Sequence, residues 1–276
     1  MPEKIPQTLE GVSETLLMTL LVRARESQRP DAMIKDDLAM AMVNQLDCDF
    51  SRLRMQRHDE VAVIMRMNKF DNHVRDFLRR NPDAVVIHIG CGLDTRFERV
   101  DNGLVLRQKF IHNEDSRYHI LATSVFEYGW LEEVSRFKPR PFMFIAEGVL
   151  PYFEEEQVKS LFLTLLEHFP GSELVCDAHT PFVVWVDNLH LAYAKVKARL
   201  HWSIKDGKDV EAWGNASPTG AGIRLLDEWN YYEEDESALK AFRWVRLIPP
   251  LAKSSGIFHY RLGVKNENDP PVESIL

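Results

Sequence analysis

Apolar residues recur at helical spacing in three blocks along the first 80 positions. The first block runs from Val12 to about Arg25, with Ser13 as its predicted N-cap, and Arg29–Asp31 ends it. The second runs from about Asp36 to Leu46, and the third from about Asp59 to Arg80. We therefore predict three helices before any strand.

The pattern then changes to short apolar runs that end in turn residues. A nearly unbroken β-branched run at Asp83–Ile89 closes on Gly90-Cys91-Gly92, as a buried parallel strand does at a tight turn. Further strands are predicted at Tyr118–Thr123, Pro141–Ala146, Leu174–Cys176, Ile223–Trp229 and Gly256–Val264. Helices are predicted at Glu154–Phe169 and Pro181–Leu200, and His201–Gly222 is expected to be a substrate-side insertion.

Strands that alternate with helices predict an α/β fold with a doubly wound sheet, whose strand-rich end forms an antiparallel hairpin. In such sheets ligands bind outside the carboxyl ends of the strands. The leading helices cannot belong to the sheet, so we expect them to form a cap over those ends.

Composition narrows the class of protein. The chain has 276 residues, 45% hydrophobic and 28% charged, with a formal net charge of -8. This charge disfavours nucleic acid as a partner, and no apolar run is long enough for a membrane helix. Cys48, Cys91 and Cys176 are far apart, so neither a disulfide framework nor a metal site is indicated, and a cytoplasmic location is expected.

Gly90 and Gly92 are the first candidates for ligand binding. Residues without a side chain let backbone amides approach a cofactor at the end of a strand, although a purely structural turn would use the same glycines. A nicotinamide dinucleotide fingerprint requires a third glycine where this chain has Thr95, so hydride transfer is the weakest of the functions considered.

Two segments together, Ile87–Arg96 with the glycine turn and Phe144–Phe153, resemble the leucine carboxyl methyltransferase superfamily. The resemblance is stronger to its bacterial branch of tetracenomycin-type polyketide O-methyltransferases. Further matching segments are Arg23–Ser27, Arg29–Ala32, Gly222–Trp229 and His259–Arg261. The resemblance implies a class I (Rossmann-like) fold that binds S-adenosylmethionine, with an N-terminal helical cap and an antiparallel last strand.

The resemblance also implies which residues meet the cofactor. Glu147 matches an acid beside the cofactor, and Arg66 matches a basic residue for the methionine carboxylate, with Arg25 as a less secure second one. The full predicted set for S-adenosylmethionine is Arg25, Arg66, Gly90, Cys91, Gly92, Ser124, Val125, Glu127 and Glu147. For Cys91 a role as small filler between the glycines is the alternative, and for Glu127 a role as cap of the helix around Trp130.

One departure from the family pattern concerns the acid expected about 20 residues after the glycines, which binds the ribose hydroxyls. The segment 100–109 runs almost directly into what looks like the next helix, which suggests that the second strand is deleted. The alternative makes Leu104–Ile111 a short strand and lets Glu114 or Asp115 supply the acid.

On the acceptor side, Asp177 and His179 follow a predicted strand and are candidates for a catalytic base or for orienting the acceptor. A structural role in the loop is the alternative for His179. Asp94 and Arg96 are expected to pair locally or to cap the next helix rather than to touch the cofactor.

We expect one domain with four parts: a helical cap (1–80), a cofactor-binding core (81–180), a helix with the insertion (181–222) and C-terminal strands (223–276). The predicted function is S-adenosylmethionine-dependent O-methyl transfer to a small molecule, a polyketide-like hydroxyl or a carboxylate. A catalytically degenerate relative that binds a ligand or a protein is the alternative. The oligomeric state, a homodimer included, is left open.

Overall fold

The computed structural model describes residues 4–7, 9, 11–53, 55–100, 118–193, 197–215, 222–233 and 237–263. Residue contacts group the chain into two compact units: unit 1 comprises Met1–Arg80 and Gly92–Val134, and unit 2 comprises Asn81–Cys91 and Ser135–Leu276. The chain therefore passes from one unit to the other inside the predicted glycine turn, between Cys91 and Gly92.

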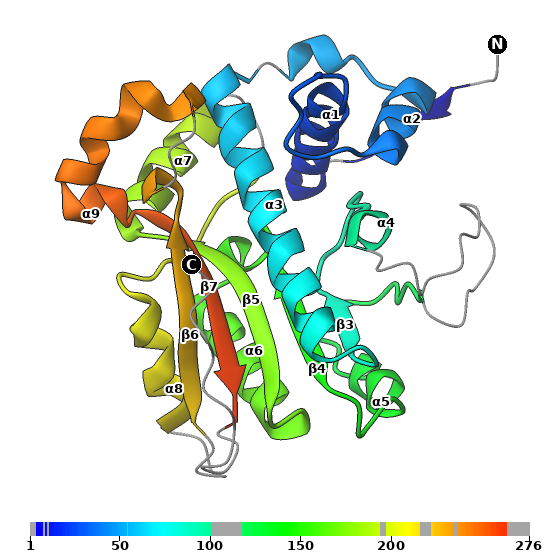
Figure 1. Ribbon diagram of the computed structural model, residues 1–276, viewed down its shortest axis with the longest axis vertical. Coiled ribbons are helices and arrows are strands. Elements are labelled where there is room, and N and C mark those ends of the chain that lie inside the picture. Colours follow the sequence, from blue (N-terminus) through cyan, green and yellow to red (C-terminus); the bar gives the residue numbers. More distant parts are fainter. Residues whose placement is uncertain are drawn as a thin grey trace. The chain divides into compact units, whose positions relative to one another are not determined.

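Unit 1 is helical. Its main helices are α1 (Thr15–Ser27), α2 (Asp37–Gln45) and α3 (Arg57–Arg80), as Figure 1 shows. Its shorter elements are β1 (Ile5–Pro6), η1 (Gly11–Glu14), β2 (Leu46–Asp47), η2 (Phe50–Arg52), α4 (Arg96–Val100) and α5 (Trp130–Ser135), whose last residue falls in unit 2. All three helices predicted for the first 80 residues are confirmed.

Apolar stripes on these helices form the core of unit 1. Val22 of α1 packs with Ile64 and Met67 of α3, while Leu20 of α1 packs with Ala39 of α2. Helix α2 begins where its sequence predicts, because the side chain of the N-cap residue Asp36 accepts a hydrogen bond from the amide of Ala39.

Unit 2 is built on a five-stranded mixed sheet in the order β3-β4-β5-β7-β6 (Figure 1). Its strands are β3 (Val85–His88), β4 (Phe142–Ala146), β5 (Ser172–His179), β6 (Ile223–Asn230) and β7 (Ser255–Leu262). Strands β3, β4 and β5 are parallel, whereas β7 runs antiparallel to both β5 and β6. The predicted α/β class and the antiparallel last strand are confirmed.

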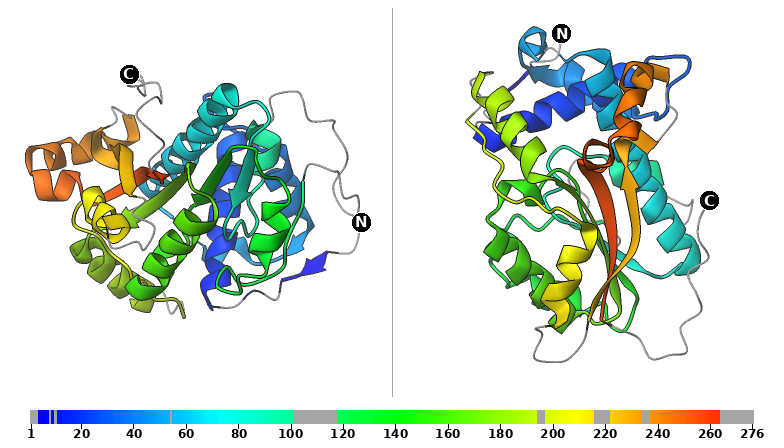
Figure 2. Two further views of the ribbon diagram at one scale, coloured as in Figure 1. Left: turned by 90° about the horizontal axis from the view of Figure 1, so that it is seen from below. Right: turned by 90° about the vertical axis from the view of Figure 1, so that its left-hand side faces the viewer.

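Helices of unit 2 cover one face of this sheet. Helix α6 (Glu155–His168) and helix α8 (Glu211–Asn215) lie on the same side, as the two views of Figure 2 show. The ring of Phe162 on α6 meets the rings of Trp213 on α8 and Tyr260 on β7, each at 5.6 Å between centroids. The other elements of unit 2 are η3 (Leu150–Tyr152), α7 (Pro181–Tyr193), η4 (Gly207–Val210), η5 (Tyr231–Glu233), η6 (Ser237–Leu247) and α9 (Pro249–Ala252).

Three local predictions are wrong. Tyr118–Thr123 forms no strand: its residues are exposed, and its one described backbone bond is a turn from Thr123 to Leu121. A strand needs a partner strand, which local β-propensity cannot supply. Ser13 lies inside η1 instead of capping α1, and residues 197–200 are no longer helical.

The segment that bears on the second strand, Leu104–Ile111 with Glu114 and Asp115, lies outside the described residues. Both predictions for it, deletion and a short strand, therefore stay predictions. Among the residues that are described, β3 forms one edge of the sheet, and its four residues are only half-buried. The cap position of the helical segment and the single-domain organisation also stay predictions.

Candidate functional site

The carboxyl ends of β3 and β4 lie side by side in unit 2. His88 pairs with Ile145, and the amide of Ile89 donates to the carbonyl of Ile145 at 2.8 Å. Because both strands point the same way, the residues that follow them, Gly90 and Glu147, leave the sheet at the same edge. This edge is the candidate site.

Gly90 has a structural reason to be glycine. Its φ of 62° is left-handed, and a Cβ there would lie 2.7 Å from Cγ2 of Val149. Gly148, directly after Glu147, is also left-handed with a φ of 64°. The turns after β3 and β4 therefore pack against each other, and the half-buried Glu147 directly precedes the glycine-dependent bend at Gly148.

Asp177, predicted as a catalytic candidate, lies at the same edge of the sheet as Gly90 and Glu147, and its side chain binds the backbone there. Ala146 pairs with Cys176, so Asp177 lies level with Glu147. The Asp177 side chain is fully buried, and its Oδ1 accepts a hydrogen bond from the amide of Gly148 at 2.7 Å. Burial, and less strongly the charge of Asp177, raises the pKa of the neighbouring Cys176 thiol well above its ordinary value.

His179 lies two residues further along β5, where it pairs with Ser255 of β7. Its Nδ1 is 2.9 Å from Oγ of Ser255. Asp187 on α7 carries a raised pKa because burial outweighs its attraction to His179 and His190. His179 therefore interacts with polar groups of β7 and α7 in unit 2.

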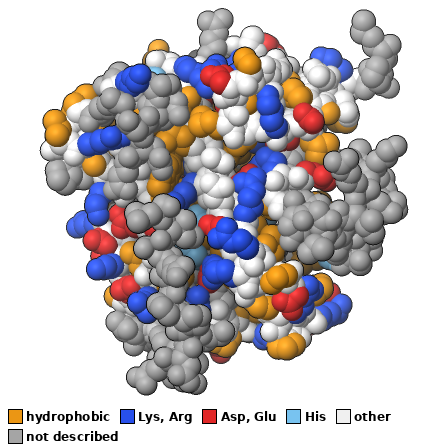
Figure 3. All heavy atoms as spheres, in the orientation of Figure 1, with side chains coloured by type: hydrophobic (Ala, Val, Ile, Leu, Met, Phe, Trp, Pro, Cys, Tyr) orange, Lys and Arg blue, Asp and Glu red, His pale blue; other side chains and the backbone are white. Residues whose placement is uncertain are grey.

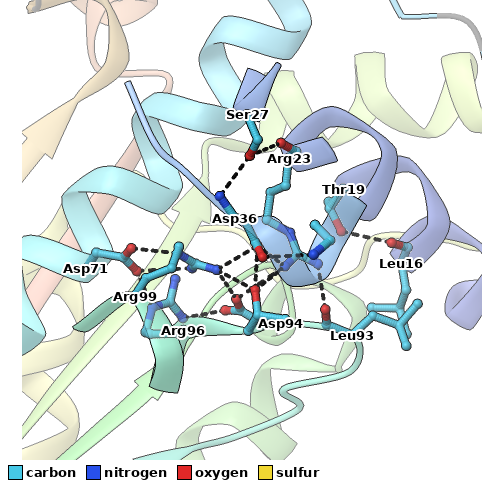
Figure 4. A network of polar contacts seen from close by, with 12 residues as sticks. Leu16, Thr19, Arg23, Ser27, Asp36, Asp71, Leu93, Asp94, Arg96 and Arg99 are labelled. Carbon is cyan, nitrogen blue, oxygen red and sulfur yellow. Dashed lines mark hydrogen bonds and ion pairs between the residues drawn. The ribbon is translucent and has the colours of Figure 1, made fainter. Parts of the chain in front are cut away.

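Unit 1 holds the other half of the glycine turn. Gly92 is left-handed with a φ of 51°, and a Cβ there would lie 2.6 Å from Cδ2 of Leu16 on α1. The residues that follow, Leu93 to Arg96, are held by a buried ionic network (Figure 4). The network joins three arginines to three aspartates and a threonine: Arg23, Arg96, Arg99, Asp36, Asp71, Asp94 and Thr95.

Arg23 is the centre of this network. Its guanidinium donates to Asp36 and to the hydroxyl of Thr95, both at 2.7 Å, and to the carbonyl of Leu93 at 2.5 Å. The hydroxyl of Thr95 in turn donates to Asp36. Burial alone would lower the pKa of Arg99, but Asp94 and then the other acids outweigh this and raise it. Thr95, which stands where a dinucleotide fingerprint needs its third glycine, is a buried structural residue of this network.

The predicted local pairing of Asp94 and Arg96 is confirmed, with 2.8 Å between Oδ2 and Nη1. The importance of Arg23 was missed, although a signal exists. Arg23 follows Leu20 and precedes Ser27 at helical spacing, so an arginine lies within the apolar stripe of α1.

Arg25 and Arg66, the predicted ligands of the methionine carboxylate, lie on α1 and α3 of unit 1. Arg25 is exposed, and its Nη1 is 2.8 Å from Oε1 of Glu60. Arg66 is half-buried. Their roles as cofactor ligands stay predictions.

The residues predicted to flank the adenine lie in unit 1, and one of them, Glu127, borders a hollow there. Ser124 accepts a hydrogen bond from the amide of Phe126, and the carbonyl of Val125 accepts one from the indole of Trp130 at 2.9 Å. Glu127 and Trp130 border an open hollow of about 650 Å³. The other lining residues are Ile120, Leu121, Ala122, Thr123, Gly129 and Glu133.

Two further kinds of feature, a metal site and a membrane-spanning helix, are absent from the part of the chain that the structure describes. No group of three or more histidine, cysteine or acidic side chains there is arranged to hold a metal ion. No helix there combines the length and apolar character of a membrane span. On the face drawn in Figure 3, basic and acidic side chains are interspersed with apolar ones.

Comparison with known proteins agrees with this fold. A family model described as leucine carboxyl methyltransferase matches residues 16–104. The tetracenomycin polyketide synthesis O-methyltransferase TcmP of Streptomyces glaucescens is 29% identical over 271 residues, which cover 91% of this chain and 97% of that protein. The S-adenosyl-L-methionine-dependent methyltransferase dpfgK of Gibberella zeae is 28% identical over 190 residues, 60% of this chain and 64% of that protein.

Among solved structures, a methyltransferase candidate from Thermobifida fusca YX has a similar fold, with a TM-score of 0.50 and 12% identity over 88% of this chain and 95% of that one. The parallel strands, the antiparallel last strand and these matches define a protein of the methyltransferase fold. The predicted resemblance to the leucine carboxyl methyltransferase superfamily is confirmed.

Proposed function

We propose that the protein is an S-adenosylmethionine-dependent O-methyltransferase that acts on a small molecule. The observation that carries this proposal is the common edge of β3 and β4, where the turn at Gly90 and the carboxylate of Glu147 leave the sheet together. The names of TcmP and dpfgK support the reaction class and the cofactor.

The residues at this edge fit a nucleoside cofactor chemically. A turn that depends on Gly90 exposes backbone donors, and the half-buried carboxylate of Glu147 can accept hydrogen bonds from an amino group or from ribose hydroxyls. The bound cofactor would supply an electrophilic methyl group on a sulfonium with a good leaving group. The protein then has mainly to align the acceptor oxygen with that methyl, and to exclude water.

Little acid–base chemistry is required of the side chains. A carboxylate acceptor needs no base, whereas a hydroxyl acceptor must lose a proton, and Asp177 and His179 are the groups predicted for this step. The other predicted cofactor residues remain predictions: Arg25, Arg66, Cys91, Gly92, Ser124, Val125 and Glu127.

Calorimetric titration with S-adenosylmethionine tests the proposal. We expect affinity in the micromolar range for the wild type and at least a tenfold loss for Glu147→Ala, because a charge-assisted hydrogen bond contributes about 1.5–3 kcal/mol. Glu167→Ala is the matched control, since Glu167 is exposed on α6 of the same unit. Equal affinity of wild type and Glu147→Ala would contradict the proposed role of this edge.

The second candidate function is that of a catalytically degenerate methyltransferase relative, which binds a ligand or a protein, and two observations favour it. Among the described residues no strand lies beyond β3, and the strand predicted at Tyr118–Thr123 does not form. Both glycines of the turn also have packing reasons to lack a Cβ. If folded wild-type protein releases no heat with millimolar S-adenosylmethionine, this second candidate is favoured.

A further inference from the structure

The contact between Asp177 and Gly148 joins the end of β5 to the turn after β4. The carboxylate of Asp177 is fully buried, and the hydrogen bond that it accepts from the amide of Gly148 is 2.7 Å long. A backbone amide at a strand end has no ladder partner and needs another acceptor. A carboxylate is a strong acceptor for it, because such charge-assisted bonds are about twice as strong as neutral ones.

The same turn is fixed on its other side by packing. The side chain of Val149 occupies the space in front of Gly90, with Cγ2 and Cγ1 at 2.7 and 3.0 Å from the position a Cβ would take. Two residues after Glu147 are therefore fixed in place. The amide of Gly148 is bound by Asp177, and the side chain of Val149 packs against the turn at Gly90. With Gly148 in a left-handed conformation, the backbone at this point has little freedom.

We propose that Asp177 is a positioning residue, which fixes the turn so that Glu147 is presented at the cofactor edge. This inference rests on the proposed function, because it assumes that Glu147 meets the cofactor. A carboxylate that is shielded from solvent and already binds a backbone amide is poorly placed to accept a proton from an incoming acceptor. Asp177 would thus contribute to cofactor affinity and not to proton transfer.

Three variants separate these roles. Asp177→Asn keeps an oxygen acceptor of the same shape but no basic carboxylate, whereas Asp177→Ala removes the acceptor. Glu173→Gln is the matched control on the same strand, because Glu173 is equally buried but binds His259 and Arg261, and its β5 position lies four residues away. The measurements are affinity for S-adenosylmethionine by calorimetry and hydrogen exchange of the Gly148 amide by nuclear magnetic resonance.

We expect Asp177→Asn to bind S-adenosylmethionine within threefold of wild type and to keep the Gly148 amide protected. Asp177→Ala should bind at least tenfold more weakly, and its Gly148 amide should exchange at least tenfold faster. Glu173→Gln should leave both quantities within threefold of wild type even if it lowers the melting temperature. An Asp177→Ala variant with normal affinity, or an Asp177→Asn variant as impaired as Asp177→Ala, would overturn the proposal.

The two readouts also separate this proposal from the proposed function. If the wild type does not bind S-adenosylmethionine, the proposed function fails, and with it the assumption about Glu147; exchange at Gly148 still decides whether Asp177 holds the turn. If Asp177→Ala does not fold, Asp177→Asn decides alone. Near-normal affinity of Asp177→Asn for S-adenosylmethionine and a protected Gly148 amide support the positioning role of Asp177, and loss of both overturns that role.

Discussion

At the scale of single residues, the sharpest test concerns Gly90. Its left-handed backbone disfavours any side chain, and a Cβ would overlap Val149. We expect Gly90→Ala to lower the free energy of unfolding by about 1–3 kcal/mol and to weaken cofactor binding. Adding Val149→Ala should restore part of the stability, since it removes the overlap but not the backbone strain.

Gly129→Ala is the control for this prediction. Its φ is not left-handed, and the nearest atom to an added Cβ is 4.0 Å away. We therefore expect a change within about 0.5 kcal/mol in chemical denaturation. If Gly90→Ala were as stable as Gly129→Ala, the packing of the turns after β3 and β4 against each other would not contribute to stability.

A second residue-scale prediction compares two arginines of α1. Arg23 is 1% exposed and binds Asp36, Thr95 and the backbone of Leu93. Arg23→Leu removes the closer of the two guanidinium groups that bind Asp36 and leaves the Leu93 carbonyl without this donor, so we expect a loss of about 3–5 kcal/mol in unfolding free energy. Arg25→Leu removes a single ion pair of a side chain that is 45% exposed, and should cost no more than about 1 kcal/mol.

Denaturation midpoints of the two variants, measured side by side, decide this comparison. Similar losses would show that the network around Arg23 is not the anchor of the segment Leu93–Arg96. Salt dependence adds a further check, because screening weakens exposed ion pairs more than buried ones.

At the scale of elements, periodicity predicts what depends on neighbouring residues in the sequence. The three helices of unit 1, helix α6 and the strands β3 to β7 were predictable because their apolar residues follow a regular period. Tyr118–Thr123 has a similar local pattern, but a strand also requires a partner, and pairing between distant residues leaves no local signal. The bond from Asp177 to Gly148 spans 29 residues and was unpredictable for the same reason.

Helix α7 allows a prediction about pH. Burial raises the pKa of Asp187 above its ordinary value of 3.8, so ionisation of this residue costs stability in the folded state. The stability that depends on protonated Asp187 is fully present below the pKa of this residue in the unfolded chain. It is lost as the pH rises through the pKa of Asp187 in the folded protein. Asp187→Asn should therefore be more stable than wild type near pH 7, and the difference should vanish below about pH 3.8.

Thermal denaturation of both proteins across this pH range provides the measurement. Glu167→Gln serves as the control, because Glu167 is exposed and should show no comparable difference. A less stable Asp187→Asn at neutral pH would mean that attraction to His179 and His190 outweighs burial, which is the opposite of the expected sign.

At the scale of the whole molecule, composition predicts the class of protein but not its organisation. The net charge of -8 and the alternation of elements predict an α/β protein without nucleic acid as partner. The division into two compact units inside the glycine turn leaves no trace in composition, because it depends on which distant segments contact each other. The buried network that holds Leu93–Arg96 likewise combines residues from α1, α3 and α4 and the segments before α2 and α4. Arg23 and Asp71, which lie within the apolar stripes of α1 and α3, are its local anomalies in the sequence.

The last prediction concerns the stability of the whole chain in the presence of nucleotides. A ligand that binds only the folded state adds about 2.7 kcal/mol at 100 times its dissociation constant. For a chain of this size we expect a rise in melting temperature on the order of 5–10 °C with S-adenosylmethionine.

NAD should give no rise, because Thr95 occupies the third glycine position and its hydroxyl is bound to Asp36 and Arg23. The Gly90→Ala variant should respond less than wild type. A shift with NAD alone would favour an oxidoreductase, and no shift with either nucleotide would favour the degenerate relative.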